Sequence, residues 1–394
     1  MSNKIFIILF VLVTVSSLLI GCATPLVRHP LPVEFSESSQ IPGIPFAKFW
    51  GDEVPPFFDN VVGQPREKLK QEFSSIFGKA HNYLALSGGG ANGAFGAGLL
   101  SGWSASGNRP EFTMVTGIST GAIMAPFAFL GSAYDAQIKE MYTTYSTKDL
   151  VKEHNLLTTI TGSAAADTKP LQKMLAKYID QGVVQAIATE YEKGRRLFIG
   201  TTNLDAKRPV IWNIGLIAAT HRPDAPALIR KIILASASIP GAFPPVIIEV
   251  ESGGRHYDEM HVDGGTATQV FLYPADVNWE FVIQHLEVKG TPRVFVIRNS
   301  FLDPEYEAVE TKIFPIANIS INSLIRTQGI GDMYRIYLDC QRDGIEYNLA
   351  YIPETFDLKP NESFDPVYMG KLFDLGYRMA EKGYPWDQAP PGFE

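Results

Sequence analysis

Two successive strand–turn–helix units, each with a glycine-containing turn, constrain the fold of this chain more than any other feature. The first unit has the apolar run Tyr83-Leu84-Ala85-Leu86, a turn over 87–93 and a small-residue helix over 94–103. The second has the run 112–116, a turn over 117–121 and another small-residue helix. Short, fully apolar runs are typical of parallel strands covered by helices on both faces. We therefore predict an α/β fold, a three-layer α/β/α arrangement around a mostly parallel central sheet.

The remaining periodicity extends this pattern along the chain. Further strands are predicted at 196–201, 246–250, 256–262, 293–298 and 345–352, and helices at 135–145, 170–179, 227–237, 323–333 and from Pro366 onward. The hydrophobic content of 45% is enough for one large core. We divide the chain into an N-terminal leader over 1–21, a proline-rich spacer and short helix over 22–79, a main domain over 80–300 and an α/β extension over 301–394, packed on that domain.

The N-terminus has the pattern of a lipoprotein signal peptide. Lys4 precedes an apolar run over 5–20, which ends in Leu19-Ile20-Gly21-Cys22. Such a lipobox predicts cleavage before Cys22 and lipidation of its thiol. An uncleaved anchor helix is the alternative, and either interpretation places the protein on a membrane. We expect a bacterial cell-envelope protein, and Ala23 is compatible with the outer membrane of a diderm cell.

Charge and cysteine content restrict the possible partners and cross-links. The formal net charge of −8 disfavours binding to a phosphate backbone, so nucleic acid is not an expected partner. Cys340 is the second of two cysteines, so no internal disulfide is expected once Cys22 is modified. Cys340 is interpreted as a structural thiol. The sequence does not determine the oligomeric state.

The second turn, Gly117-Ile118-Ser119-Thr120-Gly121, has the G-x-S-x-G form. Between a buried strand and a helix, its glycines permit a sharp turn that presents the serine hydroxyl as a nucleophile. The first turn contains Gly88, Gly89 and Gly90, whose backbone N–H groups could hold an oxyanion. A purely structural turn is one alternative. A dinucleotide site is another, but it would require an acidic residue at the end of the second strand.

Asp263, in Val262-Asp263-Gly264-Gly265, is the candidate base for Ser119. Asp-Gly is also a favoured hairpin turn, and alone it would be interpreted as one. A partly desolvated carboxylate at a strand end could nevertheless accept the serine proton, because desolvation raises its basicity.

Together these three motifs resemble the patatin-like phospholipase family over about 83–265. The resemblance implies a catalytic domain over 80–300, with Ser119 as nucleophile, Asp263 as the dyad acid, Gly88, Gly89 and Gly90 as the oxyanion loop, and no metal or cofactor. We expect the amide of Thr120 to assist that loop. The stretch 235–245 is also similar to the family's A-S-x-A-x-P-x-x-F-P-P segment. Ser87 and Asn92 depart from the family, which often has an aspartate and a basic residue there, so a head-group preference based on that charge is not implied.

The implied activity is hydrolysis of fatty-acyl esters of a lipid or phospholipid through an acyl-serine. One alternative is a conventional α/β-hydrolase with a Ser-Asp-His triad, for which His285 would be the histidine. Another is a metal site, since four potential ligands crowd one strand: His256, Asp258, His261 and Asp263. A third is a lipid-anchored binding protein without catalysis.

Overall fold

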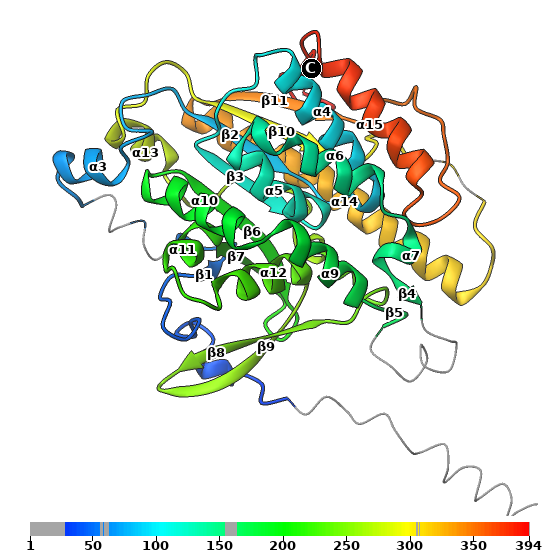
Figure 1. Ribbon diagram of the computed structural model, residues 1–394, viewed down its shortest axis with the longest axis horizontal. Helices are drawn as coiled ribbons and strands as arrows, with labels where there is room; N and C mark the ends of the chain where they lie inside the picture. The colour runs from blue at the N-terminus through cyan, green and yellow to red at the C-terminus, as the bar shows by residue number, and fades with distance from the viewer. Residues whose placement is uncertain are drawn as a thin grey trace, which may run out of the picture.

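The computed structural model describes residues 28–55, 58, 63–153, 164–304, 306 and 308–393. A twisted sheet lies at the centre, with helices on both faces (Figure 1). Five of its strands are parallel and adjacent, in the order β6 (Arg196–Asn203), β3 (Met114–Ile118), β2 (Asn82–Leu86), β10 (Arg293–Arg298) and β11 (Glu346–Tyr351). The predicted α/β class with a mostly parallel central sheet is confirmed.

The antiparallel strands lie on the β6 side of the sheet. The strand β7 (Arg208–Asn213) pairs with β6, and β1 (Lys48–Trp50) pairs with β7 at the edge. A long hairpin of β8 (Val246–Ser252) and β9 (Arg255–Asp263) joins the sheet through the last residues of β9, which pair with β6. A separate small ribbon consists of β4 (Lys152–Glu153) and β5 (Ala166–Asp167).

Side chains alternate between two cores because successive strand residues point to opposite faces. Leu84 and Leu86 of β2 face the larger core, whereas Tyr83 and Ala85 face the smaller one. Elements around the larger core include α4 (Gly93–Ala105), α5 (Thr120–Leu130), α6 (Asp135–Thr143), α9 (Lys169–Tyr178), α10 (Gln181–Glu192), α11 (Ile214–Ala219), α12 (Ala225–Ser236) and α15 (Pro366–Ala380). The smaller core includes residues of α14 (Ile313–Asp343) and, partly buried, of α13 (Trp279–His285).

The C-terminal residues are an integral part of this arrangement. The strand β11 extends the parallel sheet, and α15 packs closely on α4. Gly98 and Gly102 of α4 face the backbone at Phe373 and Tyr377, and there is no space there for a Cβ atom. Two helices that approach this closely require small residues at the contact, which explains the glycine-rich sequence of α4.

The proline-rich segment that the sequence predicts to be a spacer is described over 28–55, 58 and 63–64. Its described part lies against the domain: β1 joins the sheet, Gln40 forms a backbone bridge with Glu251, and Arg28 forms an ion pair with Asp205. Prolines prevent long ladders, so the segment is held by short bridges and side-chain contacts that leave no periodic pattern.

Other differences concern the extent of elements. The helix predicted at 323–333 is α14, which runs from Ile313 to Asp343, and β7 and α10 were not predicted. The short helix after Pro65 is α3 (Arg66–Glu72), and α7 (Thr147–Leu150) is a single turn. Within the part of the chain that the structure describes, no helix combines the length and apolar character needed to cross a membrane. The leader over 1–21 and Cys22 lie outside the described residues.

Candidate active site

Ser119 lies in a strained turn between β3 and α5. Its backbone has φ 54° and ψ −122°, a conformation that non-glycine residues rarely adopt outside functional sites. Gly117 and Gly121 make this turn possible, because a Cβ atom at Gly117 would lie 2.5 Å from the carbonyl oxygen of Gly121. A Cβ atom at Gly121 would lie 2.7 Å from the carbonyl oxygen of Ser87. The G-x-S-x-G motif is therefore required by packing at both glycines, and it holds Ser119 at the carboxyl edge of the sheet.

A second serine fixes the backbone of Ser119. The N–H of Ser119 donates to Oγ of Ser236 (3.0 Å), and that hydroxyl donates to the carbonyl oxygen of Gly200 on β6 (2.7 Å). Ser236 is the last residue of α12 and is fully buried. Sequence reasoning did not assign it a role, although it lies within the 235–245 segment that resembles the family.

Strand pairing brings Asp263 to Ser119. On β6, Gly200 pairs with Ile118 of β3, and the next residue, Thr201, pairs with Asp263 of β9. The strands β3 and β9 therefore meet end to end along the same side of β6, and Ser119 and Asp263 both lie at their junction. This placement depends on the register of three strands that are far apart in the sequence.

The carboxylate of Asp263 is buried, with 5% of the residue exposed. Its Oδ1 accepts a hydrogen bond from the N–H of Gly265 (2.7 Å). Its Oδ2 is buried and has no hydrogen bond of normal geometry to any described residue. Burial raises the pKa of Asp263 from 3.8 to about 7, although the nearby Ser119 hydroxyl and the Gly265 amide lower it in part. A carboxyl group with this pKa can accept and return a proton near neutral pH.

A buried polar chain lies directly behind Asp263. Trp212 Nε1 donates to Thr201 Oγ1 (2.7 Å), and Thr201 Oγ1 lies 3.0 Å from His261 Nδ1. His261 Nε2 lies 3.1 Å from Glu259, which forms an ion pair with Lys48 of β1. Because the ionised Glu259 can only accept, His261 donates from Nε2. Burial lowers the pKa of His261, and in the neutral ring Nδ1 is then an acceptor, so the Thr201 hydroxyl donates to it. Burial opposes ionisation of Glu259, but His261 and Lys48 lower its pKa to about 2.

The glycine-rich loop turns its backbone toward Ser119. Gly89 has φ 155° and Gly90 has φ 56°, both accessible mainly to glycine. The N–H groups of Gly89, Gly90 and Thr120 make no hydrogen bond to any residue in the described ranges. The N–H of Gly88 instead donates to the carbonyl oxygen of Gln269 (3.1 Å), so this amide is already engaged.

Asn299 holds the loop in place and had no signal in the sequence. Its N–H donates to Oγ of Ser87 (2.9 Å), and its Nδ2 donates to the Ser87 carbonyl oxygen (3.0 Å). Its Oδ1 accepts from the N–H of Gly96 in α4 (3.1 Å). Asn299 follows β10, so the strand next to β2 fixes the turn that leaves β2.

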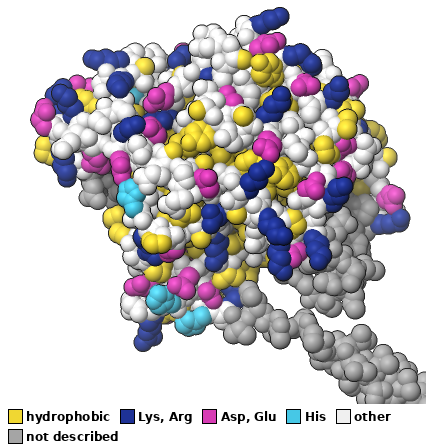
Figure 2. Space-filling model, in the orientation of Figure 1, with side chains coloured by type: hydrophobic (Ala, Val, Ile, Leu, Met, Phe, Trp, Pro, Cys, Tyr) yellow, Lys and Arg dark blue, Asp and Glu magenta, His cyan; other side chains and the backbone are white. Residues whose placement is uncertain are grey.

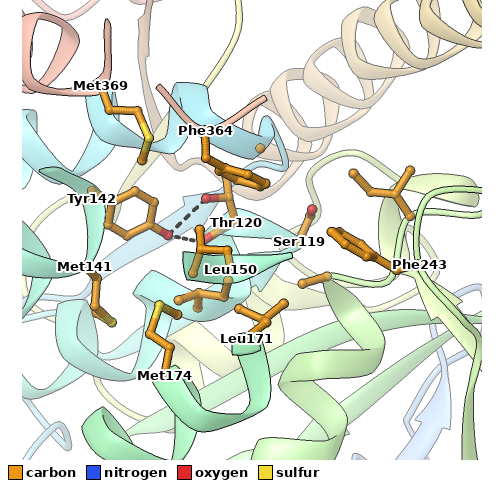
Figure 3. A pocket seen from close by; sticks show the side chains of 14 residues that line it. Ser119, Thr120, Met141, Tyr142, Leu150, Leu171, Met174, Phe243, Phe364 and Met369 are labelled. Atoms are coloured by element: carbon orange, nitrogen blue, oxygen red, sulfur yellow. Dashed lines mark hydrogen bonds between the residues drawn. The ribbon is translucent and has the colours of Figure 1, made fainter. Parts of the chain in front are cut away.

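An apolar cavity opens beside Ser119 (Figure 3). The cavity is narrow, with a volume of about 50 Å³. The labelled side chains in Figure 3 are mostly aliphatic or aromatic: Met141, Leu150, Leu171, Met174, Phe243, Phe364 and Met369. The hydroxyl of Tyr142 also faces the cavity, but it is already hydrogen-bonded to Thr120. It accepts from the Thr120 side chain and donates to the Thr120 carbonyl oxygen. The cavity therefore matches a hydrocarbon chain attached to a group that reacts at Ser119.

The residues proposed for the alternatives lie elsewhere or are occupied. His285 is at the end of α13, where Nδ1 contacts the carbonyl oxygen of Phe281 (2.9 Å) and the ring stacks on Phe281. The next residue, Leu286, accepts from the N–H of Gly78, which precedes the amino end of β2. Ser119 follows the carboxyl end of the parallel strand β3, so His285 and Ser119 lie at opposite edges of the sheet. The described residues contain no group of three or more side chains suited to a metal ion. His256 is exposed and contacts Glu249.

Residues 84–276 match the family model described as patatin-like phospholipase. The chain therefore contains a domain of the patatin-like phospholipase family. The chain is also similar to the crystal structure of VipD from Legionella pneumophila, with 12% identity and a TM-score of 0.37. That alignment covers 76% of this chain and 66% of the other, and we draw nothing from so distant a likeness. A comparison with curated proteins gives no match.

Proposed function

We propose that this protein is a serine acyl-hydrolase with a dyad of Ser119 and Asp263 that cleaves fatty-acyl esters of lipids. The observation that carries the proposal is the meeting of a strained, presented serine with a buried carboxylate whose pKa is about 7. The Oδ2 atom of that carboxylate is free to accept the serine proton. Membership of the patatin-like family supports the same chemistry.

In the proposed reaction, Ser119 Oγ attacks the ester carbonyl carbon while its proton passes to Oδ2 of Asp263. The free N–H groups of Gly89, Gly90 and Thr120 stabilise the negative oxygen that forms. The C–O bond of the ester then breaks, and the leaving alcohol takes the proton from Asp263. Water then gives a proton to Asp263 and attacks the acyl-serine carbonyl carbon. The bond from that carbon to Ser119 Oγ breaks, Oγ takes the proton back from Asp263, and the fatty acid is released. No metal or cofactor takes part in these steps.

The apolar cavity supports a substrate with a long acyl chain. Among the described residues, the lining holds no charged side chain, so a hydrocarbon can enter without stripping water from an ion. The chain would extend from Ser119 toward Met141 and Met174, which lie across the cavity in Figure 3. A lipid carboxylic ester, such as that of a phospholipid or lysophospholipid, is the substrate class that fits this arrangement.

The rate of acylation should depend on the ionisation of Asp263. The base is active only when deprotonated, and burial raises its pKa to about 7. We therefore expect kcat/KM for p-nitrophenyl esters to rise about tenfold per pH unit below about pH 7 and to level above it. The measurement is a pH–rate profile of the full chain, with fluorophosphonate labelling of Ser119 followed over the same range.

The labelling experiment separates an enzyme from a binding protein. Fluorophosphonate reacts with an activated serine, so labelling should follow the same pH dependence and disappear in Ser119→Ala. If the parent protein is not labelled at any pH and hydrolyses no ester, the proposed activity is wrong. A profile that levels near pH 4 would retain the enzyme but would mean that the pKa of its base is not raised above the usual 3.8 of an aspartate.

We also propose that a lipid attached to Cys22 anchors the protein in the cell envelope. The support is the sequence Leu19-Ile20-Gly21-Cys22 after an apolar run. Cells fed an alkyne fatty acid should incorporate it into the parent protein, and the Cys22→Ala variant should carry none. Equal labelling of both proteins would disprove this attachment site.

A further inference from the structure

The long helix α14 extends far beyond the sheet it covers. With 31 residues, it is about 46 Å long, whereas the six residues of β10 span about 20 Å. Since α14 connects the parallel strands β10 and β11, it runs antiparallel to them, and its first half lies at their carboxyl edge. Ser119 lies at the same edge, after β3.

Contacts along α14 show where the helix leaves the body. Met333, Ile336 and Cys340 are buried in the smaller core. Asp332 accepts from the N–H of Gln269 (2.6 Å), in the loop that follows Asp263. The preceding residues, 313–325, form a segment that we call the overhang, and none of its described side chains is buried.

The overhang is rich in apolar residues, and aliphatic side chains among its described residues are exposed, which is unusual for a solvent-facing helix. Its thirteen positions hold no charged residue. Ile316, Ile321 and Leu324 are exposed by 50%, 51% and 69%. A run of this kind on a surface marks a place where the protein contacts another apolar phase.

Positive charge lies on another side of the Ser119 cavity. In α9, Leu171 and Met174 line that cavity, whereas Lys169, Lys173 and Lys177 point outward at every fourth position. Figure 2 shows Lys and Arg side chains gathered over α9. These lysines and Lys152 of β4 line a groove that shares Met174 with the cavity.

The charge of this groove is only partly balanced. Asp149 and Asp167 also line it, Lys169 forms an ion pair with Asp167 (3.4 Å), and Lys177 pairs with Glu140 (2.8 Å). Lys152 and Lys173 make no ion pair with any described residue. Two free ammonium groups therefore remain, and they would favour a negatively charged surface.

We propose that the overhang and the two unpaired lysines of the groove, Lys152 and Lys173, dock together on an anionic lipid surface. The overhang inserts its aliphatic side chains, the lysines contact lipid phosphates, and the mouth of the Ser119 cavity lies between them. Figure 1 shows the start of α14 at the same end of the molecule as α7, β4 and α9. This contact rests on the proposed function, because it would place the cavity where a lipid ester can enter. It is independent of the lipid on Cys22.

Insertion can be measured without catalysis. In the full chain carrying Ser119→Ala, Leu324→Cys is labelled with an environment-sensitive fluorophore and mixed with phosphatidylcholine–phosphatidylglycerol vesicles that contain spin-labelled acyl chains. The matched control is Leu338→Cys, on the same helix, 55% exposed, but close to the body of the domain. We expect strong quenching at 324 and little at 338. Equal quenching at both positions would overturn the proposal. So would self-quenching of the fluorophore at 324 without vesicles, because it would indicate contact between two copies of the chain.

Hydrolysis gives a second readout. Changing Ile316, Ile321 and Leu324 together to Gln should lower the rate on vesicle lipids, relative to a water-soluble short-chain ester, by at least about tenfold. Lys152→Gln with Lys173→Gln should lower it about fivefold per lysine on anionic vesicles at low salt. Leu338→Gln and the distant pair Lys68→Gln with Lys70→Gln serve as controls. If the ratio of the rate on vesicle lipids to the rate on the short-chain ester is unchanged in these variants, docking is contradicted. If the parent hydrolyses neither substrate, the proposed function is contradicted, and the quenching experiment still tests docking.

Discussion

Replacing Ser119 with alanine is expected to lower kcat/KM for p-nitrophenyl acyl esters by about 10⁴-fold or more. The variant loses the nucleophile and retains only the amides of Gly89, Gly90 and Thr120, which can polarise an ester but cannot form an acyl-enzyme. Asp263→Asn should cause a loss of similar size, because the amide has the same shape but accepts no proton. The two losses should not add in the double variant, since the residues act as one unit.

The control for this experiment is His285→Ala. In a conventional triad the histidine is the base, and its removal would be as damaging as the loss of the serine. In this structure His285 stacks on Phe281 at the end of α13, so we expect at most a twofold change. Inactivation by His285→Ala would establish the triad instead. Activity that survives in Ser119→Ala would exclude the dyad and leave the binding-protein interpretation.

The second large effect concerns stability, and it has the opposite sign to the effect on activity. Asp263→Asn should stabilise the folded protein while it abolishes catalysis. The pKa of Asp263 is about 7 in the folded state, above its usual 3.8, so folding favours the protonated form. The contribution of protonated Asp263 to the free energy of unfolding is complete below about pH 4. It is lost progressively as pH rises and is absent above about pH 7. At about 1.4 kcal/mol per pKa unit, the full loss is on the order of 4 kcal/mol.

Asparagine does not ionise and avoids this loss. Its Oδ1 can still accept from the N–H of Gly265, and its amide can donate toward Oγ of Ser119. We expect urea unfolding to show a stabilisation of about 4 kcal/mol near pH 8, decreasing to about 2 kcal/mol near pH 5. The exposed Asp374→Asn is the control and should show no such trend. A pH-independent difference between parent and Asp263→Asn would mean that the Asp263 pKa is not raised by folding.

Such a trade between stability and activity is expected where a site needs a charge in a buried position. The polar chain behind Asp263 differs, because its buried charges are compensated. Its members are paired, and the burial of Glu259 is offset by Lys48 and His261. The strand that carries the buried carboxylate is therefore fixed by a satisfied network two residues away.

The sequence by itself determined the class of fold and the local geometry of the nucleophile. The apolar runs at 83–86 and 112–116 define buried parallel strands, because periodicity and turn chemistry are local properties. The same holds for Ser119, whose turn is specified by the glycines on either side of it. Asp263 could be proposed, but the sequence alone did not distinguish it from a hairpin turn.

Only the tertiary structure decided how these parts act together. The pairing of Gly200 with Ile118 and of Thr201 with Asp263 brings the base to the serine, and the burial there sets its pKa. Engagement of the Gly88 amide by Gln269, the anchoring of the glycine loop by Asn299 and the docking of the N-terminal segment all depend on residues distant in sequence. Register, burial and long-range hydrogen bonds exist only once the sheet has formed, so no local pattern in the chain encodes them.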